Sequence, residues 1–342
     1  QLGSVARIRD AAAAAKATLG RVDVPVPTPT DDQLFAWIEG LCATPHRRPG
    51  TAEGRLGERW VAARFTELGL QDVREDPVPI DVWQAERWQL TVDGKPLECG
   101  FLLNSGFTAA SGVTAPLVLA AGRKDAELRG ALVVVEAELR YGAGKADGRT
   151  FFAHEREFVG GLAAEQAAFP HNLLGDFLKL PGLDDYERAR KAGAAGVVVA
   201  TGDLLSLATS FYWPYDGTPK SLPALYCSRE DSPRLLAAAK SGTEATLVQT
   251  GSVAKGVMHN VCATLPGASD DVLLITSHHD SAHRGGVEDA SGIAQVLAQA
   301  WAWSQVPREQ RPLTLVFVAA AGHFHKGQGA LAFATAHPEL LA

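Results

Sequence analysis

Histidines and carboxylates gather in one short stretch near the carboxyl-terminal end of the chain. Residues 277–292 read Ser-His-His-Asp-Ser-Ala-His-Arg-Gly-Gly-Val-Glu-Asp-Ala-Ser-Gly and contain three histidines and three carboxylates. Neutral imidazole and carboxylate are ligands that bind zinc and related metals. An acid two residues from a histidine can fix the tautomer of that histidine. His278 and Asp280 therefore indicate a metal ligand and its supporting carboxylate.

Two predicted strands bring this stretch to the edge of a sheet. The apolar runs 272–276 and 313–318 are typical of buried strands, and residues 291–303 between them have helical spacing. Strand, helix and strand at this spacing predict a right-handed crossover in a parallel sheet. His278 and His323 each follow the carboxyl end of a strand, where open α/β sheets bind their ligands. We expect the two imidazoles to share one site.

Glu288 and Asp289 precede the predicted helix and have two interpretations. Carboxylates at a helix N-terminus favour the helix by about 0.3–1 kcal/mol each, and Ser291 can cap its free N–H groups. Combined with the histidines at positions 278 and 323, the pair instead favours a metal site. The residues alone predict a carboxylate ligand at Glu288 or Asp289 and do not choose between the two.

The amino-terminal part of the chain reads as two helices followed by strands. Residues 30–41 and 53–68 have amphipathic helical spacing, the first after a capping threonine. Residues 73–103 alternate as short strand-like pieces, with a turn at Asp93 and Gly94. These elements belong with the carboxyl-terminal crossover.

The pattern changes near residue 113. Strands are predicted at 131–135, 196–200 and 222–226, with a short helix at 186–191. Short apolar strands alternating with helices predict a smaller α/β unit. This unit is inserted into the domain that the two ends of the chain form together.

The motifs in their order resemble a known family. Asn260-Val-Cys-Ala-Thr-Leu-Pro-Gly267, a buried strand, His-x-Asp-Ser and x-Asp-Ala-Ser-Gly-Ile are similar to the co-catalytic zinc exopeptidases of metallopeptidase family 28, typified by aminopeptidase Y and plasma glutamate carboxypeptidase. The segment His46–Gly54 resembles the amino-terminal motif of that family. Residues 113–250 look like the protease-associated (PA) domain that many members carry.

The resemblance implies an α/β fold with two domains. A mostly parallel, zinc-peptidase-like (phosphorylase/hydrolase-like) domain is expected from residues 1–112 and 252–342, interrupted by a PA-type α/β domain at 113–251. Two further ligands of the family, an acid and a histidine, normally come later than residue 342. The peptidase-like sheet is therefore expected to be incomplete at its carboxyl-terminal side.

Carried over by position, the resemblance makes His278 a metal ligand and Asp280 its catalytic supporting acid. Glu288 stands where the family has a metal-bridging aspartate. Where the family has Gly-Glu-Glu, with a general base and then a ligand, this chain has Gly-His323-Phe324. We predict that His323 binds metal or serves as the base, and that Phe324 supplies no ligand.

Four other residues are weaker candidates. His279 and His325 are alternative metal ligands, and each alone is more typical of a surface or supporting residue. Tyr212 and Trp213, within an aromatic segment of the insert, fit either a substrate pocket wall or a packed corner of the core.

The function predicted from these motifs is hydrolysis of peptide or small amide bonds by a metal-dependent exopeptidase. The expected cofactor is one or two zinc ions, with another divalent metal as the alternative. The alternative is a catalytically inactive peptidase fold, a pseudoenzyme, that acts as a binding or scaffold module. Discrimination between the two depends on metal binding.

Composition limits the classes of partner that are expected for this protein. A net charge of −7 without a basic run excludes nucleic acid and anionic membranes as expected partners, and no apolar run approaches the ~20 residues of a membrane span. Four separated cysteines predict buried thiols, with one disulfide as the alternative. Cytoplasmic location and secretion after signal removal both remain open, and the sequence indicates no oligomeric state.

Overall fold

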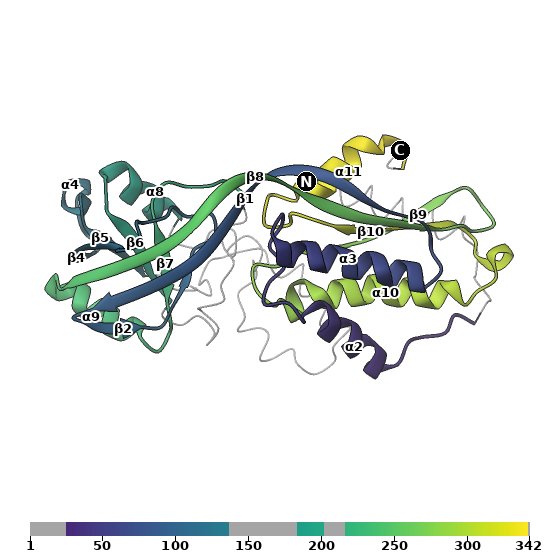
Figure 1. Cartoon of the computed structure of the whole chain (residues 1–342), viewed down its shortest axis with the longest axis horizontal. Helices are drawn as coiled ribbons and strands as arrows, with labels where there is room; N and C mark the ends of the chain where they lie inside the picture. Colours follow the sequence, from purple (N-terminus) through teal and green to yellow (C-terminus); the bar gives the residue numbers. More distant parts are fainter. Residues whose placement is uncertain (1–24, 137–182, 202–215, 341–342) are drawn as a thin grey trace, which may run out of the picture. The chain divides into compact units, whose positions relative to one another are not determined.

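The structure is a computed structural model that describes residues 25–136, 183–201 and 216–340 (Figure 1). Contacts divide the chain into two compact units. The first takes in residues 1–82, 215–217 and 254–342, and the second takes in residues 83–214 and 218–253. The contact boundary at Val82 precedes the expected domain boundary near residue 112, because strands up to Phe101 pair within the second unit.

The first unit is a sheet covered by helices. Its helices are α2 (Asp31–Leu41), α3 (Ala52–Glu67), α10 (Ser291–Ser304) and α11 (Gln328–Ala336), with short turns η2 (Gly286–Ala290), η3 (Arg308–Gln310) and η4 (Pro338–Leu340). Its strands are β9 (Val272–His278), β10 (Thr314–Ala320) and parts of β1 (Gln71–Val92) and β8 (Glu244–Leu265). β10 pairs in parallel with β9 and antiparallel with β8, so the predicted β9–α10–β10 crossover is confirmed.

Apolar side chains on the two faces of this sheet form its core. Helices α2, α3 and α10 cover one face and α11 lies on the other (Figure 1). On the first face, Phe65 of α3 packs on Phe317 of β10 with ring centroids 6.1 Å apart. This burial holds the covering helices against β9 and β10, whose ends lead into the loops that follow.

Local sequence explains where the helices begin. Thr30 and Thr51 cap α2 and α3 by accepting the backbone N–H groups of Gln33 and Gly54, at 3.2 and 3.0 Å. The expectation that Ser291 caps α10 is wrong, because its hydroxyl donates to the Val287 carbonyl.

The second unit is a smaller α/β arrangement. It contains β2 (Lys95–Leu97), β3 (Cys99–Phe101), β4 (Val113–Leu119), α4 (Asp125–Leu128), β5 (Leu132–Glu136), α8 (Leu183–Ala192), β6 (Gly196–Ala200), β7 (Ala224–Cys227) and α9 (Ser232–Ser241). Strands β4, β5, β6 and β7 are parallel, whereas β3 pairs antiparallel with β7 and β8 pairs antiparallel with β4. The described strands form a mixed sheet rather than a mostly parallel one.

Strand β1 departs from the sequence expectation for residues 73–103. It is one continuous strand to Val92 instead of several short pieces, because neighbouring strand β8 is equally long and supplies hydrogen-bond partners along the sheet. The predicted turn is present, with left-handed backbone at Asp93 (φ 51°) and Gly94 (φ 69°) joining β1 to β2.

The four cysteines are free thiols, so the disulfide alternative is wrong. Burial raises the pKa of Cys227 and Cys262 to about 12. Among the described helices, none combines the length and apolar character that crossing a membrane requires.

Candidate metal centre

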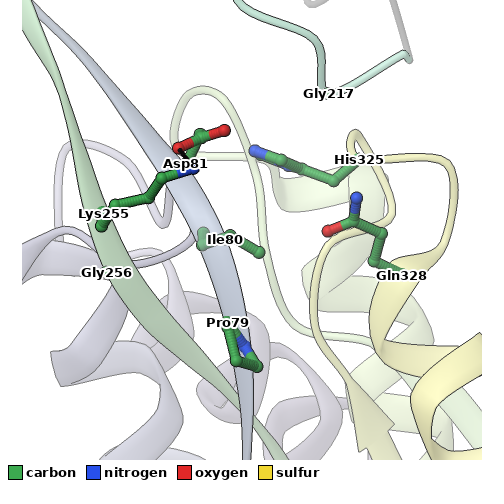
Figure 2. A pocket seen from close by; sticks show the side chains of 8 residues that line it. All are labelled: Pro79, Ile80, Asp81, Gly217, Lys255, Gly256, His325 and Gln328. Atoms are coloured by element: carbon green, nitrogen blue, oxygen red, sulfur yellow. Dashed lines mark ion pairs between the residues drawn. The ribbon is translucent and has the colours of Figure 1, made fainter.

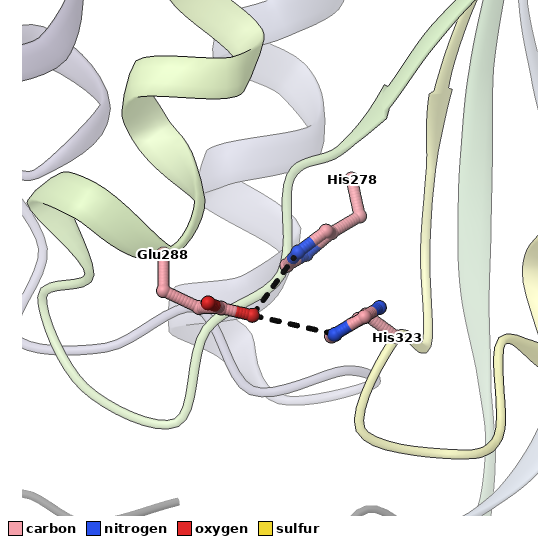
Figure 3. A group of neighbouring side chains, drawn as sticks. All are labelled: His278, Glu288 and His323. Carbon is pink, nitrogen blue, oxygen red and sulfur yellow. Dashed lines mark ion pairs between the residues drawn. The ribbon is translucent and has the colours of Figure 1, made fainter. Parts of the chain in front are cut away.

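The parallel register of β9 and β10 brings two histidines to the same edge of the sheet. His278 is the last residue of β9 and lies opposite Ala320, the last residue of β10. The chain then turns at Gly322, whose φ of 72° favours glycine, and presents His323 beside His278. Glu288 reaches the same place from the η2 turn that precedes α10 (Figure 3).

The three side chains converge on one point. Glu288 Oε1 lies 3.5 Å from His278 Nε2 and 3.3 Å from His323 Nε2 (Figure 3). The two imidazole rings are stacked, with centroids 4.0 Å apart and an interplanar angle of 11°. One donor atom from each residue lies within 4.8 Å of the other two. The loops therefore bring together the three residues that the sequence predicted as metal ligands.

Asp280 supports both histidines from a fully buried position. Its carbonyl oxygen and its carboxylate Oδ1 lie 3.1 and 3.4 Å from His278 Nδ1. Both atoms are acceptors, so Nδ1 must carry the proton in the neutral imidazole and Nε2 is left with a free lone pair. Oδ1 also accepts the backbone N–H of His323 at 3.2 Å. Asp280 thus orients one imidazole and fixes the loop that carries the other.

Charged neighbours within the cluster shift the pKa values of its residues. Burial alone lowers the pKa of His278, but hydrogen bonds to Asp280 and Glu288 outweigh burial and raise it to about 10. Hydrogen bonds from His278 and His323 lower the pKa of Glu288 to about 2. The pKa of Asp280 falls to about 2, because contacts with His278 outweigh the opposing effect of burial. A cation is favoured at Nε2 of His278, whether proton or metal.

Asp289 is held mainly by the start of α10. Its Oδ1 accepts the Gly292 N–H at 3.0 Å, and its Oδ2 accepts the Ser277 hydroxyl. A Cβ at position 292 would lie 2.3 Å from both carboxylate oxygens, so this position requires glycine. Oδ2 is nevertheless only 3.6 Å from His278 Nε2. Asp289 therefore stabilises the start of α10, as the first of the two interpretations predicted, whereas Glu288 faces the histidines.

The structure turns the other two candidate histidines away from the cluster. His279 is buried, and its Nε2 lies 3.0 Å from the carbonyl oxygen of His259. His325 is buried, and its ring nitrogens have no hydrogen-bond partner among the described residues. Burial lowers the pKa of both imidazoles.

His325 lines a separate pocket in the first unit (Figure 2). The cavity has a volume of about 250 Å³. Its lining residues are Pro79, Ile80, Asp81, Gly217, Lys255, Gly256, His325 and Gln328. Lys255 and Asp81 form an ion pair of 2.6 Å across the neighbouring strands. Neither His278 nor Glu288 lines this pocket.

Phe324 directly follows His323 and is the residue that the sequence predicted to supply no ligand. The ring is buried and makes T-shaped contacts with the imidazoles of His278 and His323, with centroids 5.9 and 5.3 Å away. It packs the imidazoles in place and offers no donor atom to a metal. Tyr212 and Trp213, the candidate substrate contacts, lie outside the described residues.

Sequence reasoning missed the role of Arg47 in this region. Arg47 is fully buried, and its guanidinium donates to carbonyl groups on the loop between His278 and Glu288. The only signal was the His-Arg-Arg-Pro-Gly segment, whose chemistry gave no reason to place it near the histidines.

One family profile matches the segment of the chain that carries the three cluster residues. The profile of Peptidase family M28 matches residues 260–341, which contain β9, α10, β10 and all three cluster residues. No curated protein sequence matches the chain.

Three solved structures share the fold at low sequence identity. The Peptidase M28 precursor from Shewanella amazonensis SB2B is 20% identical with a TM-score of 0.66, over 91% of this chain and 68% of that chain. BSAP, a zinc aminopeptidase from Bacillus subtilis, is 18% identical with a TM-score of 0.57, over 87% and 62%. The aminopeptidase from Aneurinibacillus sp. strain AM-1 is 19% identical with a TM-score of 0.52, over 90% and 66%. The chain spans about two thirds of the length of each.

Proposed function

We propose that the protein is a metal-dependent hydrolase of peptide or amide bonds, with zinc held by His278, Glu288 and His323. The spacing of the donor atoms carries this proposal. Two ligands at 2.0–2.1 Å from a tetrahedral zinc ion are separated by roughly 3.3 Å. The two Nε2–Oε1 distances in the cluster are 3.3 and 3.5 Å. Three protein ligands with a fourth position open to solvent are typical of catalytic zinc.

Exopeptidase activity is the specific reaction that we propose. The M28 profile match covers the site-bearing segment, and two structures of the same fold are described as aminopeptidases, one of them a zinc enzyme. Assignment of residues 113–251 as a PA-type domain, and the likeness to aminopeptidase Y or glutamate carboxypeptidase, belong to the same proposal.

One metal ion fits the described residues better than two. Phe324 supplies no ligand, and Asp289 already accepts two hydrogen bonds, from Ser277 and Gly292. In the described part of the chain, His278, Glu288 and His323 are the group of at least three potential ligands within binding distance.

The protein residues of the site have separate roles. When bound, zinc supplies Lewis-acid polarisation of the scissile carbonyl group. Asp280 fixes the tautomer of His278, and Glu288 Oε1 faces both imidazoles as the carboxylate ligand. Since Nε2 of His323 points at Glu288, we assign His323 as a ligand rather than as the base. Its side chain is 42% exposed, so the site is open to solvent and substrate.

Metal binding and peptide cleavage test the proposal together. Protein purified without chelators is titrated with zinc against a chromophoric chelator, and is then assayed with amino-acyl 4-nitroanilides and short peptides. Peptides with an acetylated amino end or an amidated carboxyl end identify which terminus is recognised. We expect stoichiometric zinc and cleavage that requires one free terminus. Absence of saturable zinc binding would reject the proposal.

A non-catalytic binding module is the second candidate, and Phe324 favours it. Phe324 places a buried aromatic ring beside the histidines, where the family that this chain resembles has a metal ligand. This candidate predicts stable protein with no stoichiometric metal and no hydrolysis of any of the peptides. Zinc binding without turnover would support the metal site and reject the exopeptidase assignment.

A further inference from the structure

Arg47 connects the amino-terminal segment to the loop between two of the ligands. Its Nε donates to the carbonyl oxygen of His279 at 2.7 Å, and its Nη2 donates to that of Gly285 at 3.1 Å. Its Nη1 donates to the carbonyl oxygen of Arg284. The backbones of Arg47 and Ser281 exchange hydrogen bonds of 2.9 and 3.1 Å. One side chain therefore binds both ends of the loop 279–285.

The two ends of that loop are the attachment points of the ligands. His279 directly follows His278, so the Nε contact fixes the backbone immediately after the first ligand. The Gly285 carbonyl also accepts the Ala290 N–H at 3.0 Å and closes the turn that carries Glu288. The planar guanidinium therefore fixes the separation between the backbone segments of the two ligands.

The surroundings of Arg47 are built for this arrangement. The side chain is 0% exposed, and a Cβ at Gly57 of α3 would lie only 3.1 Å from its Cδ, so α3 leaves room for the arginine stem. A buried charge that lost these carbonyl partners would be costly, which favours one fixed conformation. Gly285 has a φ of 57°, and a Cβ there would lie 2.2 Å from the Glu288 carbonyl oxygen, so the loop has little freedom to compensate.

We infer that Arg47 is a positioning residue for the metal centre, which sets the distance between His278 and Glu288 by holding both ends of the loop 279–285. The effect of Arg47 on metal binding rests on the proposed function. The effect of Arg47 on the loop rests on the hydrogen bonds alone. Lysine keeps the charge but cannot reproduce the forked contacts.

The test compares Arg47→Lys and Arg47→Met with wild type and with Arg55→Lys. Arg55 is the control, since its guanidinium contacts Glu58, Glu75 and His259 and donates to no carbonyl group of this loop. We expect zinc affinity, measured by chelator competition, to fall about 10- to 100-fold in both Arg47 variants and to be unchanged in Arg55→Lys. The visible absorption bands of bound cobalt should also shift in Arg47→Lys.

Hydrogen exchange of the metal-free proteins supplies a readout independent of metal. Amides of residues 279–290 should exchange faster in the Arg47 variants than in Arg55→Lys, while amides of β10 remain protected. If Arg47→Met does not fold, Arg47→Lys decides the outcome by the same measurements. Unchanged loop exchange and unchanged zinc affinity in a folded Arg47 variant would overturn the inference. Wild type that binds no zinc would reject the proposed function, and loop exchange would still decide the role of Arg47.

Discussion

At the scale of single residues, the centre depends on which nitrogen of each imidazole faces the cluster. Asp280 occupies Nδ1 of His278 with two acceptors, and Glu288 Oε1 lies between the Nε2 atoms of both histidines. Residue types alone leave these orientations undefined, because each imidazole offers two nitrogens. The buried position of Asp280 removes that ambiguity for His278.

Replacement of His323 by alanine should separate metal binding from folding. Because His323 is a ligand in our proposal, we expect His323→Ala to lose at least about 100-fold in zinc affinity, more than loss of an outer partner. Its side chain is 42% exposed, so the unfolding free energy of the metal-free protein should change by less than about 0.5 kcal/mol. Chelator competition and urea unfolding measure the two quantities. His337→Ala, outside the cluster, is the control and should change neither.

The stability of the metal-free protein should depend on pH through His278. The folded pKa of about 10 exceeds the ordinary value of 6.5, so this stabilisation is fully present below pH 6.5 and is lost as pH rises through about 10. His278→Gln lacks the titrating ring. The difference in unfolding free energy between wild type and His278→Gln, from urea titrations in chelator, should therefore shrink between pH 6.5 and 10. A constant difference over that range would contradict the ion-paired imidazole.

At the scale of elements, the β9–α10–β10 crossover positions the chemistry. Parallel pairing places Ala320 opposite His278, so both loops leave the sheet at the same level. The start of α10 supplies the third component, since the turn that begins the helix also carries Glu288. A displacement of this helix start would move the carboxylate ligand.

Capping of α10 distinguishes Asp289 from Ser291. Asp289 accepts the Gly292 N–H, whereas the Ser291 hydroxyl donates to a carbonyl group and caps nothing. We expect Asp289→Ala to lower the unfolding free energy of the metal-free protein by about 0.5–2 kcal/mol and Ser291→Ala by less than about 0.5 kcal/mol. Urea unfolding in the presence of chelator measures both. A larger loss in Ser291→Ala than in Asp289→Ala would show that the serine is the cap.

At the scale of the whole molecule, the chain folds as two contact-defined units and all three cluster residues belong to the first. Strands β1 and β8 each continue from one unit into the other. Because a ligand stabilises the structure that binds it, zinc should act directly on the first unit.

Zinc should protect the two units unequally. At a free zinc concentration of 100 Kd, binding adds about 2.7 kcal/mol to the stability of the unit that contains the site. Hydrogen exchange should therefore slow in α10 and in the residues after β10, with little change in β5 and β6 of the second unit. His323→Ala should show neither effect. Equal protection of both units by zinc would contradict a site confined to the first.

The sequence by itself determined the chemistry-bearing residue types and most of the elements that carry them. Helices α2 and α3, strands β5, β6, β9 and β10 and the crossover through α10 follow from periodicity and capping, which are local properties of the chain. The continuous strand β1 was missed, because its length depends on a partner more than 150 residues later in the chain.

Only the tertiary structure decided how the polar side chains divide their roles. His278, Glu288 and His323 face one another, whereas His279 and His325 point elsewhere, although the sequence places all five on the same two loops. Side-chain direction after a strand depends on how the loop closes and on what it packs against. Arg47, over 200 residues before the ligands, makes those closing contacts, and no local pattern encodes hydrogen bonds to distant backbone carbonyl groups.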